Sequence, residues 1–519
     1  PKSRPYINLN GSTKNITSQL NPDKGIEAVR SFAVDMLDKD GELSEIFTPG
    51  HTVTDLLGQK AKIFLNIIGS VHPVDSILII DGIVGQYAFS SNTCKVTVDH
   101  AAQLKRQEIF TNHATELNGN LAQAATTIPV NDASGFITPT TEFLTYVRIG
   151  DELIQYTGIS NNNLTGCSRA QINTLAPSQH NDDTEVTSFY RLQGNAIDLA
   201  LKVMLSGGGF GLSKSATAFN QLTTSLFVQD AILFEVSDIG TEFGLVAGDH
   251  VEISGSSNNN ITTTVKSVHK IDETKSYIIV NSNLTTDTAE TATVKFKSQY
   301  DTLPEGAGLL PSQLDVKKHL DIFNLFSGNF TAMDFFLDET VKVDEFVNEQ
   351  LYRPTNLYSI PGNKIGVKMT IPPLSDIHTK TLDSGNVVNP NVIRVNRSIN
   401  KYHYNTVIFK YDFDRLDLDK PKTGKVFLNN DALTRIGAGK KPLKIEARGF
   451  RRNTVTSQTL DIAARRYLDR YKFAAEFFSI ETFFSNVDIE CGDVVIVSGL
   501  SIYDSEKGSR EFGPKVYEV

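Results

Sequence analysis

The sequence predicts a mainly β protein with α+β parts, folded as several domains. Three observations support this prediction. Short runs rich in β-branched and aromatic residues recur between Gly, Asn and Asp turns, as expected for small sheets. A few longer segments instead place apolar residues at helical spacing. The chain has 519 residues, which at about 150 residues per domain corresponds to three or four domains.

Composition excludes several classes of protein. Hydrophobic residues make up 40% of the chain and charged residues 21%, which is typical of globular proteins rather than disordered or collagenous ones. The net charge of −10 argues against a dedicated nucleic-acid-binding protein, whose domain would be basic. The three cysteines form no CxxC pair, which argues against a zinc ribbon or a disulfide-stapled scaffold. No apolar run approaches the length of a membrane-spanning helix, which is about 18 residues. We expect a soluble intracellular or virion protein without a signal peptide.

The N-terminal part is predicted to contain one helix, followed by a small barrel or sandwich. Apolar residues recur at helical spacing over Ile26–Leu37, after the start signal Asn21-Pro22-Asp23. Asp81-Gly82 is predicted to form a turn. The β-rich runs around it are Lys62–Gly69, Ser76–Ile80 and Cys94–Val98.

Two further β-rich blocks, 121–188 and 229–297, share an order of strand, Gly-Asp turn, strand and polar loop. In the first block Gly150-Asp151 is predicted to be the tight turn of a hairpin, and in the second Gly248-Asp249 precedes a strand. The blocks are either an internal duplication or two independent insertions. Their predicted strands are Thr127–Val130, Tyr146–Ile149, Glu152–Gly158, Phe234–Val236, Val251–Ile253, Thr263–Val268, Tyr277–Val280 and Ala292–Lys297.

Helices are predicted between and after these blocks. Asn195–Leu205 is followed by Gly207–Gly209, which suits the left-handed cap of a helix. Ser457–Tyr471 carries its apolar residues on one face. The remaining predicted helices are Ser312–Phe326 and Glu339–Leu351. The remaining predicted strands are Lys364–Ile371, Val392–Val395, Thr406–Tyr411, Glu476–Phe484, Val494–Val497 after the turn Gly492-Asp493, and Lys515–Val519, which we expect to be truncated.

No candidate catalytic, cofactor-binding or metal-binding residues emerge from the sequence. The ten histidines are scattered, and none forms an HExxH pair. His180 precedes two aspartates, but the polar context predicts a solvated turn. A run of four aspartates lacks the Gly and Glu of an EF-hand loop, and we predict a charged strand edge instead. That run is Asp412, Asp414, Asp417 and Asp419.

Three other motifs are predicted to be structural. Gly207–Gly211 follows a helix and lacks the Gly-Lys-Ser/Thr step of a P-loop, so it is predicted to be a helix cap. Cys167 has no identifiable His partner and is predicted to be a small buried residue at a strand end. The pairs Arg451-Arg452 and Arg465-Arg466 are too small for a nucleic-acid track. The sequence therefore predicts that the chain is not an enzyme and binds no cofactor or metal.

An ordered set of motifs nevertheless resembles a known family. Tyr146–Gly158, with its "IGDELIQY" core, is followed by Leu164–Arg169 ("LTGCSR"), then His180 and Val186. This order resembles a small β module that is common in phage tail proteins, although Ala170 replaces the usual Gly. The flanking motifs agree with that resemblance: Asp99–Phe110, Gln193–Leu201, Val343–Leu351, Arg353-Pro354, Gly362–Pro373, Asn405–Tyr411, Ser457–Tyr471 and Ile489–Val497.

Over most of residues 45–519 the chain resembles the central baseplate, or tail-tip, hub of long-tailed phages and gene-transfer particles. The resemblance implies a homotrimer at the distal end of the virion tail. Each chain would carry two tube-like β-barrel domains, so that three chains adapt a six-fold tail tube to a three-fold tip. The implied partners are distal-tail or tail-tube proteins, the tape-measure protein and a central fibre. DNA would pass through the lumen without specific binding, and the host envelope would be contacted indirectly.

The resemblance also suggests how the domains follow one another. We expect a first hub domain with a β-barrel over 1–120 and a β insertion over 121–188. The second hub domain would begin at 189–228, accept a second insertion over 229–297 and continue over 298–375. A tube-like domain would occupy 376–519. Segments 26–37, 121–188 and 229–297 are candidates for partner docking or lumen closure.

Two alternatives remain open at the level of sequence. A receptor- or glycan-binding tail adhesin would present exposed aromatic residues, and the chain has 30 Phe and 16 Tyr but no Trp. A tail-tip enzyme such as a peptidoglycan hydrolase would need paired carboxylates or a Cys/His site, and the sequence offers neither.

Overall fold

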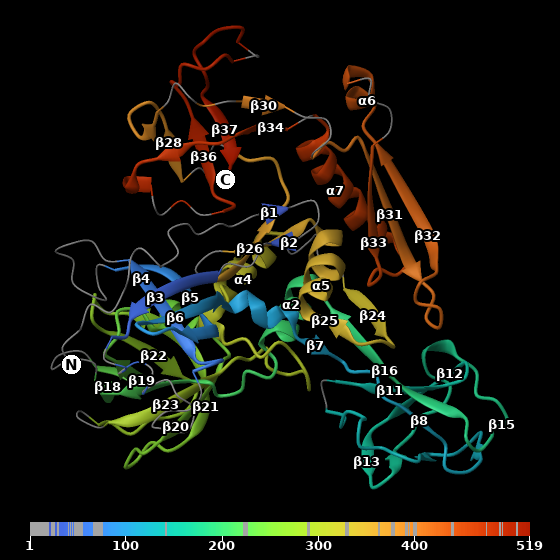
Figure 1. Cartoon of the computed structure of the whole chain (residues 1–519). Helices are drawn as coiled ribbons and strands as arrows, with labels where there is room; N and C mark the ends of the chain where they lie inside the picture. Colours follow the sequence, from blue (N-terminus) through green and yellow to red (C-terminus); the bar gives the residue numbers. More distant parts are fainter. Residues whose placement is uncertain are drawn as a thin grey trace.

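A computed structural model describes most of the chain. The described residues are 20–21, 26–27, 31–39, 56–65, 76–140, 143–221, 227–287, 291–326, 332–361, 364–374, 379–389, 395–397, 402–436, 441–473, 475–486, 491–504 and 507–519, with 41, 43, 45, 393 and 489. The protein is mainly β, with 43% strand and 18% helix. Its sheets are arranged around a central group of helices (Figure 1). None of the described sheets closes into a barrel, so the predicted β-barrels are not confirmed.

The N-terminal sheet corrects two predictions. Ile26–Leu37 is not a helix: it contains the strands β2 (Ile26–Glu27) and β3 (Ser31–Leu37). The spacing of Phe32, Val34 and Met36 also fits a strand, and β3 pairs along its whole length with β6. Tertiary pairing therefore decides an ambiguous pattern. The sheet order is β3-β6-β5-β4, where β4 is Lys60–Leu65, β5 is Ile77–Phe89 and β6 is Thr93–His100.

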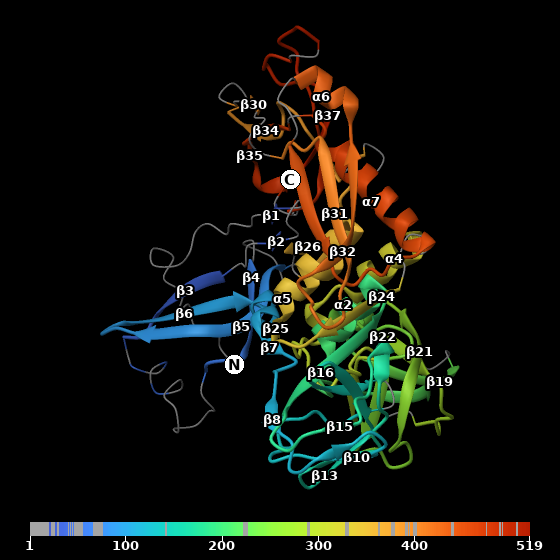
Figure 2. The same cartoon turned by 90° about the vertical axis from the view of Figure 1, so that its right-hand side faces the viewer.

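Asp81-Gly82 is not a turn but lies inside the long strand β5. Asp81 stands opposite Lys62 and forms an ion pair with it at 3.2 Å. A Cβ atom at Gly82 would lie 1.9 Å from the backbone oxygen of Asp99. Glycine is therefore required here by the close approach of β6 rather than by a turn. The β5–β6 hairpin projects from the body of the molecule (Figure 2).

The small β module predicted at 121–188 has a hydrophobic core of its own, which includes Val147, Ile154 and Leu164. Gly150-Asp151 is confirmed as a tight turn, because Ile149 pairs with Glu152 across it. The module is continuous with the centre, since β16 pairs with β11 along its first half and with β24 along its second. Its strands are β8 Ala114–Glu116, β9 Leu121–Ala122, β10 Thr127–Pro129, β11 Thr145–Ile149, β12 Glu152–Tyr156, β13 Gly158–Ser160, β14 Asn163–Thr165, β15 Gln179–His180 and β16 Glu185–Gly194.

The second β block forms a seven-stranded antiparallel sheet in the order β17-β23-β20-β21-β22-β19-β18. Four of the five predicted strands of 229–297 are present, whereas of Phe234–Val236 only Phe234 lies in a strand, as the last residue of β19. Two earlier strands join the sheet. Because this order differs from that of the small module, the two blocks do not share a topology, which disfavours a duplication. The strands are β17 Leu212–Ala216, β18 Ala218–Gln221, β19 Phe227–Phe234, β20 His250–Ser254, β21 Thr262–Lys270, β22 Ser276–Val280 and β23 Ala292–Lys297, with helix α3 Ile239–Phe243.

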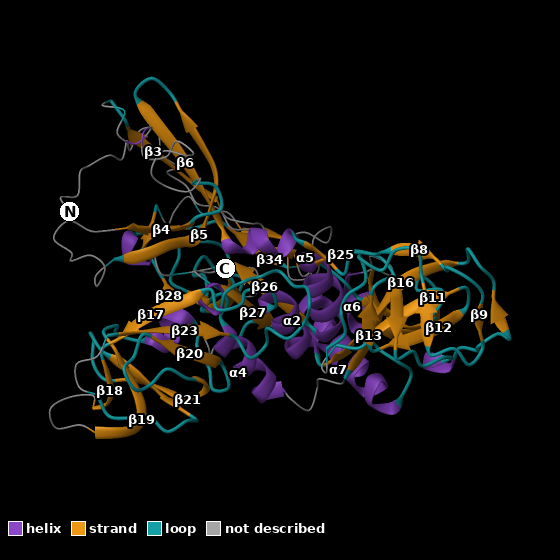
Figure 3. Cartoon of the chain, turned by 90° about the horizontal axis from the view of Figure 1, so that it is seen from below, coloured by secondary structure: helices purple, strands orange, loops and turns teal. Residues whose placement is uncertain are grey.

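The central core joins segments that are far apart in the sequence. Helix α2 (Ala196–Leu205) is confirmed, with Asn195 accepting a hydrogen bond from the Asp198 N–H as its cap. Helices α4 and α7 pack into the same hydrophobic cluster as α2. Figure 3 shows these helices between the sheets. The other central elements are η1 Ala101–Arg106, β7 Glu108–Ile109, η3 Pro311–Gln313, α4 Val316–Phe326, β24 Met333–Leu337, β25 Val341–Lys342, α5 Val343–Glu345, the π-helix η5 Phe346–Tyr352, η6 Arg353–Thr355, β26 Leu357–Pro361 and β27 Ile365–Met369.

Two of the predicted helices begin later than expected. The helix predicted at 312–326 starts at Val316, after the short turn η3. The helix predicted at 339–351 starts at Val343, because Val341 and Lys342 pair with β7 as a strand instead. In both cases a turn or a strand takes up residues at the start of the predicted helix.

The C-terminal part contains an open three-stranded sheet whose inner face is covered by α7. Helix α7 (Thr454–Tyr471) confirms the predicted helix and its apolar face. The strand predicted at 476–484 is broken into β34 and β35, and Val392 lies outside the described residues. The remaining elements are β1 Leu20–Asn21, β28 Lys380–Leu382, β29 Val387–Val388, β30 Val395–Arg397, β31 Thr406–Phe413, β32 Pro421–Leu428, α6 Asn430–Ile436, β33 Pro442–Ala447, β34 Glu476–Phe478, β35 Glu481–Thr482, η9 Phe484–Asn486, β36 Val494–Val497 and β37 Lys515–Glu518.

Within the part of the chain that the structure describes, no helix has the length and apolar character needed to cross a bilayer.

Candidate functional site

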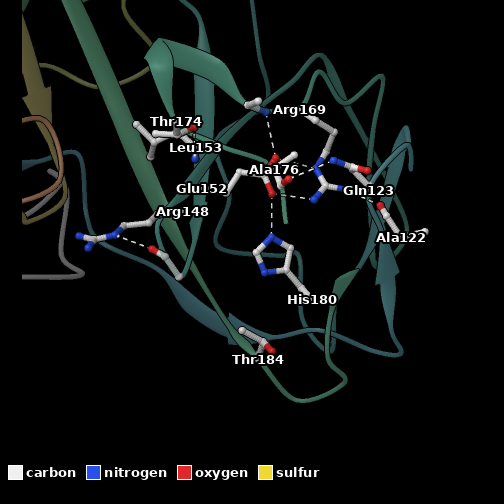
Figure 4. Close-up of polar contacts among 12 residues, drawn as sticks. Ala122, Gln123, Arg148, Glu152, Leu153, Arg169, Thr174, Ala176, His180 and Thr184 are labelled. Atoms are coloured by element: carbon white, nitrogen blue, oxygen red, sulfur yellow. Dashed lines mark hydrogen bonds and ion pairs between the residues drawn. The ribbon is translucent and has the colours of Figure 1, made fainter. Parts of the chain in front are cut away.

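A buried charge cluster lies in the small β module and joins Glu152, Arg169 and His180 (Figure 4). Glu152 opens β12 directly after the Gly150-Asp151 turn. Its Oε1 accepts hydrogen bonds from Arg169 Nε at 2.8 Å and from the Ala170 N–H at 2.9 Å. Its Oε2 accepts from Arg169 Nη2 at 2.6 Å and from His180 Nε2 at 2.7 Å. All three side chains are less than a tenth exposed.

The electrostatics of this cluster favour an ionised Glu152. Burial alone would raise the pKa of the carboxyl group, but the hydrogen bonds from Arg169, His180 and the Ala170 N–H outweigh it and lower that pKa. An ionised carboxylate can only accept, so His180 carries a proton on Nε2. Because four donors surround the carboxylate, its oxygen lone pairs are occupied by the protein itself.

The prediction that His180 lies in a solvated turn is therefore wrong. His180 belongs to the short strand β15, which pairs with β9, and its side chain is buried. Arg169 also donates to the backbone oxygen of Ala122 in β9. The cluster thus ties β9, β12, β15 and the turn before Ala170 together. All three residues belong to the ordered motif of the sequence analysis. Their contact was not predicted, because no local spacing indicates that their side chains meet.

The neighbouring aspartates have a different role from His180. Asp182 Oδ1 accepts the Gly119 N–H at 2.6 Å and the Asp183 N–H at 3.1 Å, so it closes a turn. Among the residues that the structure describes, no group of three or more His, Cys, Asp or Glu side chains is placed to hold a metal ion.

The glycine run after α2 caps the helix and also binds an internal carboxylate. Gly207 and Gly209 have φ values of 87° and 54°, in the left-handed region. Their N–H groups donate to the two carboxylate oxygens of Asp301, at 2.9 and 2.8 Å. The chain itself therefore supplies the anion that such a backbone cradle would otherwise offer to a phosphate.

The aspartate run of 412–419 does not form a strand edge as predicted. Asp412 is the last but one residue of β31, and the other three aspartates lie in the loop between β31 and β32. Asp414 accepts the Leu416 N–H at 2.9 Å and pairs with Lys422 at 2.8 Å. These contacts shape the loop, because short acidic side chains bond readily to nearby N–H groups in turns.

Cys167 and Arg451 are structural, as predicted for the former. Cys167 is buried, which raises the pKa of its thiol to about 11, and its Sγ lies 3.3 Å from the Leu164 oxygen. Arg451 stacks 4.5 Å above the Phe336 ring and donates to the backbone oxygens of Phe413 and Asp334. Neither group is exposed for chemistry.

A cavity of about 340 Å³ lies where β24, η5 and the β31–β32 loop meet. Its lining combines aromatic rings with carboxylates: Phe335, Phe336, Phe346, Phe413, Asp338, Glu339, Asp417 and Asp419. These residues come from segments about 80 positions apart in sequence, so no motif could have indicated them. We refer to this space as the β24 cavity.

The β31–β33 sheet has one covered face and one open face. Val407, Phe409 and Ile445 point into the central core beneath α7. On the outer face Val426 is 59% exposed and Leu428 is 44% exposed, beside the half-buried Ile408. Strand β32 is an edge strand in the described sheet, since it pairs only with β31. Such an edge with apolar residues is a typical site of further strand or sheet packing.

Comparison with known proteins adds no family: no protein-family model matches the chain, and no curated protein matches it.

Proposed function

We propose that the protein is a structural hub of a phage-type tail tip, which assembles as a trimer, closes the tail tube and opens for DNA passage. The ordered motifs from Tyr146 to Val497 support this proposal. The mainly β architecture, with several open sheets around one helical core, is compatible with it.

The observation that carries the proposal is the open edge and exposed apolar face of the β31–β33 sheet. In a trimer, a neighbouring copy would cover Val426 and Leu428. Sheets that stay open within one chain can continue across subunit boundaries, and assembly then satisfies their edges. Barrel-like closure would in that case be a property of the ring rather than of the single chain.

The net charge of −10 suits a wall along which DNA passes. Phosphates are repelled by carboxylates, so an acidic lining would reduce sticking during ejection. Tail-tube and distal-tail proteins, the tape-measure protein and a central fibre are the partners that the proposal requires.

The test is the solution mass of the purified chain, combined with negative-stain class averages from the same peak. A trimer of the 57.1 kDa chain has a mass of about 171 kDa. We expect three-fold or pseudo-six-fold rings at that mass, formed by the chain alone or after addition of tail-tube protein. A chain that stays monomeric under both conditions contradicts the hub and favours the adhesin.

A pair of variants locates the interface. Val426→Glu with Leu428→Glu places two charges on the outer sheet face and should shift the mass from trimer to monomer. Leu175→Glu is the matched control, because Leu175 is 86% exposed in the small module, away from this sheet. If both variants remain trimeric, the outer face of the β31–β33 sheet is not the interface.

A further inference from the structure

We propose that the side chains of Lys515 and Asp504 condense into an amide bond, a covalent cross-link within the chain that Glu476 catalyses. Lys515 is the first residue of β37, and Glu476 is the first residue of β34. Asp504 lies in the segment between β36 and β37. This inference goes beyond the hub function and does not depend on it, because it rests on the geometry of these side chains alone.

The reacting groups already lie against each other. Lys515 Nζ is 3.0 Å from Asp504 Oδ1 and 3.7 Å from Glu476 Oε1. The carbon that an amine attacks is bonded directly to Oδ1, so nucleophile and electrophile start near contact distance. Two groups held in this way react as one molecule, and the effective concentration of one at the other can reach about 10⁵ M or more.

The surroundings of the three side chains are poor in water. Asp504 is fully buried, and the side chains of Glu476 and Lys515 are only 10% and 15% exposed. The Phe512 ring lies 5.0 Å from Lys515 Nζ and stacks with the Tyr517 ring. Because buried charges lose their hydration, such a site favours the neutral amine and carboxylic acid that can react. The amide product carries no charge, so its formation removes that desolvation cost.

Two further groups are placed to assist the reaction. The Tyr517 hydroxyl donates to Glu476 Oε1 and thereby orients the carboxylate beside the lysine. The Gly513 N–H donates to Asp504 Oδ2 at 3.3 Å. When an amine adds to a carboxyl group, negative charge develops on the carbonyl oxygen, and a backbone N–H aimed at that oxygen stabilises it.

The reaction balances without a co-reactant, because an ion pair of amine and carboxylate contains the atoms of an amide and one water. A first proton passes from Lys515 Nζ to Asp504 Oδ1, and the neutral amine then attacks Cγ to form the C–N bond. Glu476 accepts a second proton from the nitrogen and returns it to Oδ1. The C–Oδ1 bond breaks, water leaves, and the third proton stays on the amide nitrogen.

The first measurement is the intact mass of the denatured full-length chain by electrospray mass spectrometry. We expect a mass that is lower than the mass calculated from the sequence by one water, about 18 Da. A mass equal to the calculated one overturns the proposal, because the two side chains are then held together by their charges alone.

Tryptic digestion locates the missing water. Trypsin cleaves after Lys507 and Arg510, so the uncross-linked chain gives 473–507 and a peptide that begins at Glu511 as separate fragments. The cross-linked chain should give these two fragments as one branched product, without cleavage after Lys515. A mass deficit without this product overturns the proposal, since dehydration within a single residue joins no peptides.

Variants assign the roles of the side chains. Lys515→Arg keeps the charge but removes the nucleophile, so it should have the full calculated mass. Glu476→Gln should leave most of the freshly purified chain at the full mass, because a proton-transfer catalyst contributes about 100-fold or more in rate. Lys422→Arg is the matched control: Lys422 pairs with Asp414 at 2.8 Å, but its side chain is 52% exposed and hydrated.

The control variant should keep the mass deficit of the unmodified sequence. A deficit that persists in Lys515→Arg overturns the proposal, and complete cross-linking of Glu476→Gln overturns the role assigned to Glu476. The melting temperature of each variant shows that it is folded.

Discussion

The Glu152 carboxylate is fully buried and accepts four hydrogen bonds from the small module itself. Removing one member of a buried ion pair typically costs about 3–5 kcal/mol, because the partner charge is left uncompensated. Glu152→Gln should therefore lower the local stability of the module by an amount of that order. Amide hydrogen exchange in β12 and β15 measures the change. Asp151→Asn, at the exposed neighbouring position, is the control and should leave exchange unchanged.

The same cluster fixes how the module responds to acid. Since the pKa of Glu152 is lower in the folded chain than its ordinary value of 4.5, its contribution to stability is present above that value. The contribution is lost as the pH falls through the lower, folded pKa. The Glu152→Gln variant should lack this acid-dependent step, and identical pH profiles would show that the cluster does not titrate.

His319 is expected to stay neutral well below the usual range for histidine. Its Nδ1 donates to the Asp315 oxygen at 2.7 Å, and its Nε2 accepts from the Tyr352 hydroxyl at 2.9 Å. Burial in the core lowers its pKa from 6.5 to about 4. The unfolded chain therefore binds this proton first, and the fold loses about 3 kcal/mol as the pH falls from 6.5 to 4. NMR titration of the imidazole, assigned with His319→Gln, should give a midpoint near 4 rather than 6.5.

At the scale of elements, the β5–β6 pair depends on the absence of a side chain at Gly82. An added methyl group would meet the Asp99 backbone oxygen at 1.9 Å, so Gly82→Ala should force the strands apart and cost more than about 2 kcal/mol. Gly424→Ala is the matched control inside a strand, because its methyl group would have only a contact of 3.7 Å. Hydrogen exchange along β6 measures the difference. Equal protection in the two variants would contradict the steric argument.

Elements with strong local patterns were predictable, while those decided by pairing were not. Helices α2 and α7 carry a cap residue and an apolar face within their own sequence, and both appear where expected. Segment 26–37 shows a pattern that fits helix and strand alike, and only its partner β6, some 60 residues later, decides between them. Asp81-Gly82 has the composition of a turn, but its glycine serves a close strand contact.

The candidate sites were less predictable than the elements for the same reason. Arg169 meets Glu152 where Ser168 pairs with Gln155, and His180 meets Glu152 from strand β15, which pairs with β9. The β24 cavity combines β24 and η5 with a loop that follows them by about 80 residues. Burial and pairing between distant segments create these arrangements, and no local spacing encodes them. The open sheets are likewise visible only in the structure.

At the scale of the whole molecule, the β31–β32 loop holds the C-terminal sheet against the small module. Arg415 donates to the Ile172 oxygen at 2.9 Å, and Leu416 and Leu418 pack with Tyr146 and other buried rings. Ile172 has a φ of 56°, which costs a β-branched residue about 1–3 kcal/mol. The surrounding contacts stabilise this strained backbone conformation. The loop thus connects the C-terminal sheet with the small module through Arg415, Leu416 and Leu418, and we refer to these three residues as the latch.

Weakening the latch should therefore let the small module move relative to α7. Arg415→Ala with Leu416→Ser and Leu418→Ser removes both the polar and the apolar contact. Spin labels at Leu175→Cys and Val455→Cys, in a Cys491→Ser background, report the distance between the two parts, because both positions are exposed. We expect a narrow distribution that broadens when the latch is removed. Lys420→Ala changes an exposed residue of the same loop and should keep it narrow. If the triple variant also stays narrow, the shared strand β16 alone fixes the arrangement, because it pairs with both β11 and β24.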